Sequence, residues 1–228
     1  MRLPRALGVF FCLTAASLLA QLASAPAPGA VIAFTLDFPG SMPSHYSIQV
    51  DSSGKADYTS GDVKSRASDA DNSDDDQPYR YSFTLSPGSR ARIFDLAARA
   101  HYFSGNINYD KHRVANTGTK TLSYKDAQQN NQAKYNYTAN PDVQELTAFF
   151  QDLSMMLEFG RRLQFDHHYQ KLALDAELKS MEEAEKQGGI VEVQAIAPIL
   201  QEIVNDPAVV NVSRSRAQRL LGKEGSAR

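Results

Sequence analysis

The feature that most limits the fold of this chain is an alternation of apolar and polar residues in several short segments. Val31–Phe38 reads VIAFTLDF, with an apolar side chain at every second residue from Ile32 to Phe38. His45–Asp51 and Tyr79–Leu85 repeat this pattern. Successive side chains of a β-strand point to opposite faces of the sheet, so each segment predicts a strand with one apolar face. Such faces need a second layer to cover them.

Two pairs of segments predict β-hairpins. The turn sequence Asp51–Gly54 is followed by a returning strand at Lys55–Thr59. The second hairpin joins Thr119–Lys125 to Ala133–Thr138 across the polar link Asp126–Gln132. Antiparallel pairing is therefore expected throughout the sheet.

Helix starts are predicted where a capping residue precedes proline, at Ser86-Pro87, Asn140-Pro141 and Asp206-Pro207. Apolar residues after Asn140 recur at spacings of three and four, which is typical of a helix packed on a sheet. One straight helix over 141–187 would be about 70 Å long, longer than a compact domain. We therefore expect a kink near Gly160 or a protruding arm.

These patterns predict an α+β fold with a small antiparallel sheet of about five or six strands. Two helices pack on the sheet, and a C-terminal helical extension follows. The expected organisation is an α+β domain over 26–159 and an extension over 160–228. Residues 60–78 are rich in aspartate and carry no long apolar run, so they predict a mobile acidic loop.

The N-terminus carries the pattern of an export signal over residues 1–25. Arg2 and Arg5 precede an apolar run, which ends at the small residues Ala23-Ser24-Ala25. The chain is therefore expected to be exported, to the periplasm or the extracellular space. Pro26 would follow the scissile bond and disfavours cleavage, so an uncleaved N-terminal membrane anchor is the alternative. We expect no transmembrane segment after the signal.

Charge and cysteine content argue against several classes of protein. The 24 basic and 26 acidic residues give a net charge of −2, which does not suit a nucleic-acid-binding protein. The single cysteine, Cys12, lies within the predicted signal and excludes a disulfide framework.

Recognised catalytic and metal-binding patterns are absent from the sequence. No G-x-S-x-G motif occurs, and the S-x-x-K match at Ser52–Lys55 falls in a predicted hairpin turn. His167 and His168 are adjacent, so on a helix they diverge by about 100° and cannot hold one ion together. We predict no catalytic residues, no metal site and no cofactor.

Two groups of residues are candidates for binding a partner. The first consists of strand tyrosines. One interpretation is an exposed aromatic face that binds a partner, and the alternative is packing between strands. The second consists of C-terminal arginines that suit an anionic partner, with a solvated helix end as the alternative. The candidates are Tyr81, Tyr124, Tyr135, Tyr137, Arg214, Arg216 and Arg219.

The stretch Tyr46–Tyr58, followed by Phe83–Pro87 and a predicted helix, resembles a group of exported bacterial domains of unknown function. Those domains open with a Y-x-V-x-I-x-x-x-G-x-x-x-Y hairpin and continue as strand, helix, strands and helix. The resemblance covers residues 31–159 and implies no activity. Where that group often carries a cysteine pair, this chain has Ser41–Ser44.

The sequence thus predicts an exported, non-enzymatic binding or envelope-associated module with a protein or envelope-polymer partner. The alternatives are a hydrolytic enzyme with an unrecognised active site and a self-associating structural protein. In the last case residues 161–187 would form a contact between two copies of the chain, so a homo-oligomer is among the expectations.

Overall fold

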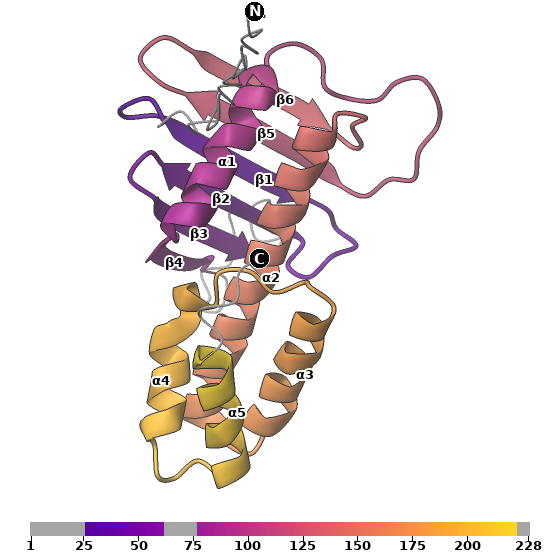
Figure 1. Cartoon of the computed structure of the whole chain (residues 1–228). Coiled ribbons are helices and arrows are strands. Elements are labelled where there is room, and N and C mark those ends of the chain that lie inside the picture. Colours follow the sequence, from indigo (N-terminus) through magenta and orange to yellow (C-terminus); the bar gives the residue numbers. More distant parts are fainter. Residues whose placement is uncertain (1–25, 62–76, 223–228) are drawn as a thin grey trace, which may run out of the picture.

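The computed structural model describes residues 26–61 and 77–222. The predicted signal at 1–25 lies outside the described residues, as do residues 62–76 of the predicted acidic loop. One antiparallel sheet is flanked on one face by two helices, and further helices gather around the far half of the second of these (Figure 1). The predicted α+β class, with a C-terminal helical extension, is confirmed.

The sheet has six strands in the order β4-β3-β2-β1-β5-β6, and all neighbouring strands are antiparallel. In each strand apolar residues alternate with polar ones. The exception is the start of β6, where the first three residues are all polar. The strands are β1 (Val31–Asp37), β2 (His45–Asp51), β3 (Lys55–Gly61), β4 (Tyr79–Thr84), β5 (Thr119–Lys125) and β6 (Asn130–Tyr135).

Strand β6 begins three residues earlier than the sequence predicts. Asn130, Asn131 and Gln132 pair with the end of β5, although none of them is apolar. The turn is shorter than the predicted polar link because Asp126 organises it. Its Oδ1 accepts hydrogen bonds from the backbone N–H groups of Gln128 and Gln129, both at 2.7 Å.

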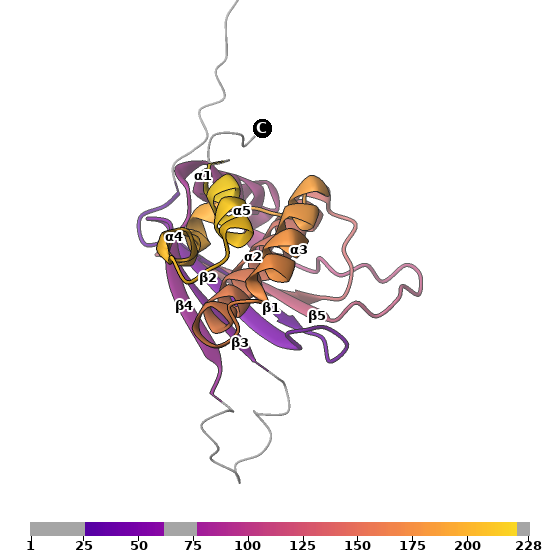
Figure 2. The same cartoon turned by 90° about the horizontal axis from the view of Figure 1, so that it is seen from below.

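Helices α1 (Pro87–Arg99) and α2 (Pro141–Tyr169) cover one face of the sheet. Ser86 and Asn140 are their N-caps, and each accepts a hydrogen bond from a backbone N–H of the first turn, as predicted. The core lies between these helices and the sheet. Phe34 on β1, for example, stacks on Phe150 of α2 with ring centroids 5.2 Å apart. In the view from below, the labelled helices all lie on the same side of the sheet (Figure 2).

The expected kink near Gly160 is wrong, whereas the far half of α2 does extend beyond the sheet (Figure 1). Helix α2 runs unbroken through Gly160 and ends at Tyr169, so it is about 43 Å long. The chain then reverses into α3 (Leu174–Lys186). Glycine is needed at position 160 for packing, because a Cβ there would lie 2.6 Å from the Cγ2 of Ile196.

The remaining elements pack around the end of α2 that extends beyond the sheet (Figure 1). They are the short helices η4 (Val193–Ile196), α4 (Ala197–Asn205) and α5 (Asn211–Leu221), which follow α3. A short helix, η3 (His101–Phe103), follows α1. The extension has buried side chains of its own: Leu163, Leu174, Leu178, Met181, Leu200, Ile203 and Leu220.

The predicted helix start at Asp206-Pro207 is also wrong, since α5 begins at Asn211. Asp206 instead closes a turn, with its Oδ1 accepting the backbone N–H of Ala208 at 2.8 Å. Its other oxygen accepts hydrogen bonds from His167 Nε2 at 2.9 Å and Lys171 Nζ at 2.5 Å. The carboxylate that would cap a helix is therefore used to hold the end of α2.

Candidate functional site

The face of the sheet opposite the helices is polar and is not covered by any described helix (Figure 2). Its side chains are the polar members of the alternating pattern that buries Ile32, Phe34 and Leu36 on the other face. No Phe or Tyr side chain of the six strands belongs to it, because the strand aromatics share the phase of the buried residues. We call this surface the open face.

Strand register arranges the open face into rows that cross all six strands. One row carries hydroxyl groups in the centre and a cation at each edge. It runs through Lys134, Thr121, Thr35, Ser47, Thr59 and Arg80. The next row is Gln132, Ser123, Ala33, Gln49, Asp57 and Ser82. Neighbouring strands lie about 4.8 Å apart, so each row presents hydrogen-bonding groups at a regular spacing.

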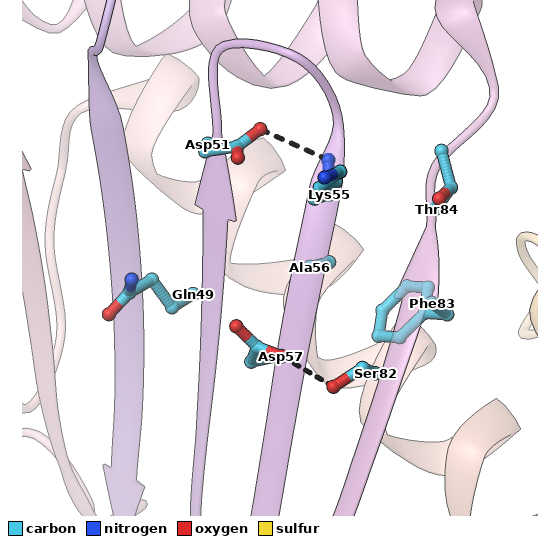
Figure 3. A pocket seen from close by; sticks show the side chains of 8 residues that line it. All are labelled: Gln49, Asp51, Lys55, Ala56, Asp57, Ser82, Phe83 and Thr84. Atoms are coloured by element: carbon cyan, nitrogen blue, oxygen red, sulfur yellow. Dashed lines mark hydrogen bonds between the residues drawn. The ribbon is translucent and has the colours of Figure 1, made fainter.

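The open face is hollowed at the end formed by β2, β3 and β4 (Figure 3). The hollow has a volume of about 430 Å³. Asp51, Lys55 and Asp57 are its charged residues. Ser82 points toward Asp57, whereas the Gln49 side chain extends from β2 toward β1, at the border of the hollow (Figure 3). The complete lining is Gln49, Asp51, Lys55, Ala56, Asp57, Ser82, Phe83 and Thr84.

The two carboxylates of the hollow have different surroundings. Asp51 closes the β2–β3 turn, where its Oδ1 accepts hydrogen bonds from the hydroxyl and backbone N–H of Ser53, at 2.6 and 2.8 Å. These bonds lower the pKa of Asp51, so this carboxylate stays ionised and is a poor general acid. Asp57 accepts the Ser82 hydroxyl at 2.6 Å. The arrangement therefore suits hydrogen bonding to a polar ligand better than proton transfer.

A histidine–carboxylate pair lies on the same face at the opposite ends of the strands. Nδ1 of His45 lies 2.5 Å from Oδ1 of Asp37, which faces it across β1 and β2. This is the geometry by which a carboxylate orients a catalytic histidine. The His45 side chain is only 10% exposed, however, which leaves little of the ring for a substrate to reach.

The structure places most of the candidate tyrosines on the covered face. Tyr124 and Tyr135 are 2% and 4% exposed, and their hydroxyls bond to Asp126 and Thr147. Tyr81 is half-buried and donates to the carbonyl of Ala195 at 2.6 Å. These three residues pack the core and its edge. Tyr137 lies beyond the end of β6 and is 43% exposed.

The candidate arginines lie on α5 and turn toward α3. Arg216 bonds to Asp175 at 2.8 Å and also to Glu182. Arg219 reaches Glu182 at 2.8 Å. Arg214 lies 3.5 Å from Asn211 and forms no ion pair within the described part of the chain. Two of the three candidate arginines of α5 therefore form ion pairs with α3, and these pairs stabilise the packing of the extension.

A buried polar cluster beneath α2 was not predicted from the sequence. Glu158 is 4% exposed and accepts hydrogen bonds from Tyr58 at 2.8 Å, Ser60 at 2.7 Å and Arg161 at 2.7 Å. Burial beside this carboxylate raises the pKa of Tyr58 well above its usual range. The signal for the cluster was a glutamate within the apolar stripe of the helix, next to Leu157.

Within 26–61 and 77–222, no group of three or more His, Cys, Asp or Glu side chains is arranged to hold a metal ion. In the same ranges, no helix has the length and apolar character needed to span a bilayer.

The residues missed by sequence reasoning are the polar ones of the open face. Their signal was present, because Gln49, Asp57 and Ser82 occupy the polar phase of predicted strands.

In comparisons with known proteins, the chain matches no family model and no curated protein.

Proposed function

We propose that this chain is an exported, non-enzymatic binding module that docks a polar partner in the envelope on its open face. The observation that carries the proposal is the uncovered face, with its cross-strand rows of Ser, Thr, Gln and Asp side chains and a hollow at one end. The expected export rests on the signal pattern of residues 1–25. The resemblance of residues 31–159 to exported bacterial domains agrees with it.

The chemistry of the face favours a partner that forms hydrogen bonds. A ligand that stacks on aromatic rings, as many sugars do, finds no ring that points out from this face. Phe83, in the lining of the hollow, pairs with the buried Ala56 and shares the phase of the covered face. From the spacing of strands and residues, the face measures roughly 24 Å by 20 Å. An open polar surface of this extent, hollowed only at one end, fits the surface of another protein better than it fits a small molecule, which is usually enclosed in a cleft.

The surroundings of the titratable side chains on the open face favour binding over hydrolysis. A hydrolytic site pairs groups whose environments push their pKa values apart. In the hollow, Asp51 is held ionised by the turn and Asp57 accepts from Ser82. The His45–Asp37 pair lies at the other end of the strands and is largely enclosed.

The test is photo-crosslinking in the native host. A benzophenone side chain is introduced at Gln49, Ser82 or Thr121 on the open face, and at Lys179 or Glu183 on the exposed surface of α3. The proposal expects one crosslinked protein partner from the open-face positions and none from the α3 positions. A second substitution, Asp57→Arg, should abolish the crosslink from Gln49.

Two results would count against this function. Crosslinks confined to α3 would favour the self-associating alternative, and light scattering of residues 26–228 would then give a mass above that of the monomer. Turnover of an ester or glycoside substrate that is lost in His45→Gln would favour the hydrolytic alternative.

A further inference from the structure

Lys120 is a buried cation that does not belong to the open face. It lies on β5 with its side chain on the helix-covered face and is 5% exposed. Its ammonium donates to the carbonyls of Asn136 at 2.9 Å and Thr117 at 3.1 Å, and to the Thr117 hydroxyl at 2.9 Å, and a longer contact of 3.5 Å reaches the carbonyl of Gly118. Among the described residues, no carboxylate forms an ion pair with it.

Burying a charge without a counter-ion is costly, and carbonyl dipoles offset only part of the lost hydration. Desolvation accordingly lowers the pKa of Lys120. The acidic residues on the first turns of α2 do not supply the missing charge. Asp142 is paired with Arg99 at 2.7 Å, and Glu145 is paired with Arg92 at 2.9 Å, both across to α1.

Lys120 lines a groove of about 290 Å³ between the end of β6 and the first turns of α2. Gln144 and Tyr137 lie in the wall of this groove and are exposed. The Gln144 side-chain amide donates to the Tyr137 hydroxyl at 3.1 Å and to the Thr138 carbonyl at 2.7 Å. The Tyr137 hydroxyl therefore retains its own proton for a ligand oxygen.

A bound anion requires a position for one of its oxygens beside the ammonium. The Thr117 hydroxyl is the replaceable partner of Lys120, because it also contacts the side-chain and backbone oxygens of Asn136, both at 3.3 Å. If a ligand oxygen takes its place, the bonds to the backbone carbonyls remain and the ammonium gains a counter-ion. Charge-assisted hydrogen bonds of this kind are shorter and stronger than neutral ones.

We propose that the groove beside Lys120 is a second binding site, which takes the carboxylate of a small monoanionic ligand. One cation matches one negative charge, and the volume suits a short acyl chain lying against Tyr135 and Ala148. The site is independent of the proposed function, because the groove lies on the helix-covered side of the sheet at the β6 edge. Loss of partner binding on the open face would leave it unchanged.

The test is an NMR titration of the whole protein with sodium butyrate and, in parallel, with the isosteric butyramide. Butyrate should give saturable shifts at the Gln144 side-chain amide and the Thr117 backbone amide. Its affinity should exceed that of butyramide by about tenfold, the difference expected for one charge-assisted contact. Binding should also raise the pKa of Lys120, measured on its side-chain resonances.

The matched substitutions are Lys120→Met and Lys125→Met, which remove a lysine from the buried and exposed ends of the same strand. Lys120→Met should weaken butyrate about tenfold, and Lys125→Met should leave it unchanged. If Lys120→Met does not fold, Tyr137→Phe and Gln144→Ala provide the test at the rim and should each weaken butyrate severalfold. Equal affinity for butyrate and butyramide would overturn the proposal. So would shifts outside the groove, or no saturation up to the solubility limit.

Discussion

Glu192 and Ser86 are 106 residues apart in the chain, yet the Glu192 carboxylate accepts both the backbone N–H and the hydroxyl of Ser86, at 2.8 and 2.7 Å. The same carboxylate accepts the hydroxyl of Ser89. Ser86 is the N-cap of α1, so a side chain from the extension completes the cap of a helix on the sheet. Glu192 has φ 54° and ψ 48°, a left-handed conformation that these bonds must offset.

This contact predicts that Glu192→Gln destabilises the whole chain. Gln keeps the shape but loses the charge, and one of its terminal groups is a donor facing Ser hydroxyls. The expected loss is about 1–3 kcal/mol in the free energy of unfolding, measured by urea denaturation. Glu183→Gln, on the exposed side of α3, is the control and should change stability by less than about 0.5 kcal/mol. Equal stability of the two variants would show that the cap contributes nothing.

Gly160 provides a second test of how the extension meets the sheet. Gly160→Ala places a methyl group 2.6 Å from the Cγ2 of Ile196, so we expect a loss of about 1–3 kcal/mol from overpacking. Gly88→Ala, in the first turn of α1, meets no atom within 4 Å and should be neutral or stabilising by up to about 1 kcal/mol. Adding Ile196→Leu removes the branched methyl and should restore part of the loss. A stable Gly160→Ala variant would contradict the close packing.

The buried Glu158 predicts a large cost for a small change. In Glu158→Gln, one terminal oxygen of the acceptor becomes an N–H donor, while Tyr58, Ser60 and Arg161 still present donors to it. Leaving a buried donor without a partner costs about 1–3 kcal/mol, which chemical denaturation would detect. The control is Glu145→Gln, whose carboxylate is 46% exposed and pairs with Arg92. A loss no greater than that of the control would argue against the cluster.

The buried tyrosines predict an alkaline unfolding transition. Burial raises the pKa of Tyr79 to about 12 and raises that of Tyr46, Tyr58 and Tyr135 further. A raised pKa in the folded state means that stability is fully present below the unfolded value of about 10 and declines as the pH rises above it. The urea midpoint should therefore hold below pH 10 and fall between about pH 10 and 12.

Absorbance at 295 nm, recorded with circular dichroism, checks this transition. The late part of the tyrosinate signal should appear together with the loss of helical signal. Ionisation of every tyrosine near pH 10, with the helices intact, would contradict the burial of these hydroxyls.

Local sequence pattern located the strands of the sheet, although the bounds of β6 differ from the prediction by three residues. Alternation placed β2 and β5 at their observed bounds, and the Ser86-Pro87 and Asn140-Pro141 pairs located the starts of α1 and α2. Period-two alternation and N-capping depend on residues that are near one another in the chain, so the sequence displays them directly. The polar residues that alternate with the apolar ones in the same strands form the open face, so this surface could also have been predicted from the sequence.

The sequence alone determined which segments of this protein form strands, which faces of those strands are apolar, and which residues cap α1 and α2. Tertiary structure alone decided that α2 passes straight through Gly160, that Asp206 holds the end of α2, and that Tyr124 and Tyr135 are buried. It also decided where Glu192, Glu158 and Lys120 lie. The physical reason is that each of these outcomes depends on a partner distant in the chain, such as Ile196 for Gly160 or Ser86 for Glu192. A hydrogen bond or a close contact between such residues exists only after the chain has folded, so no local pattern encodes it.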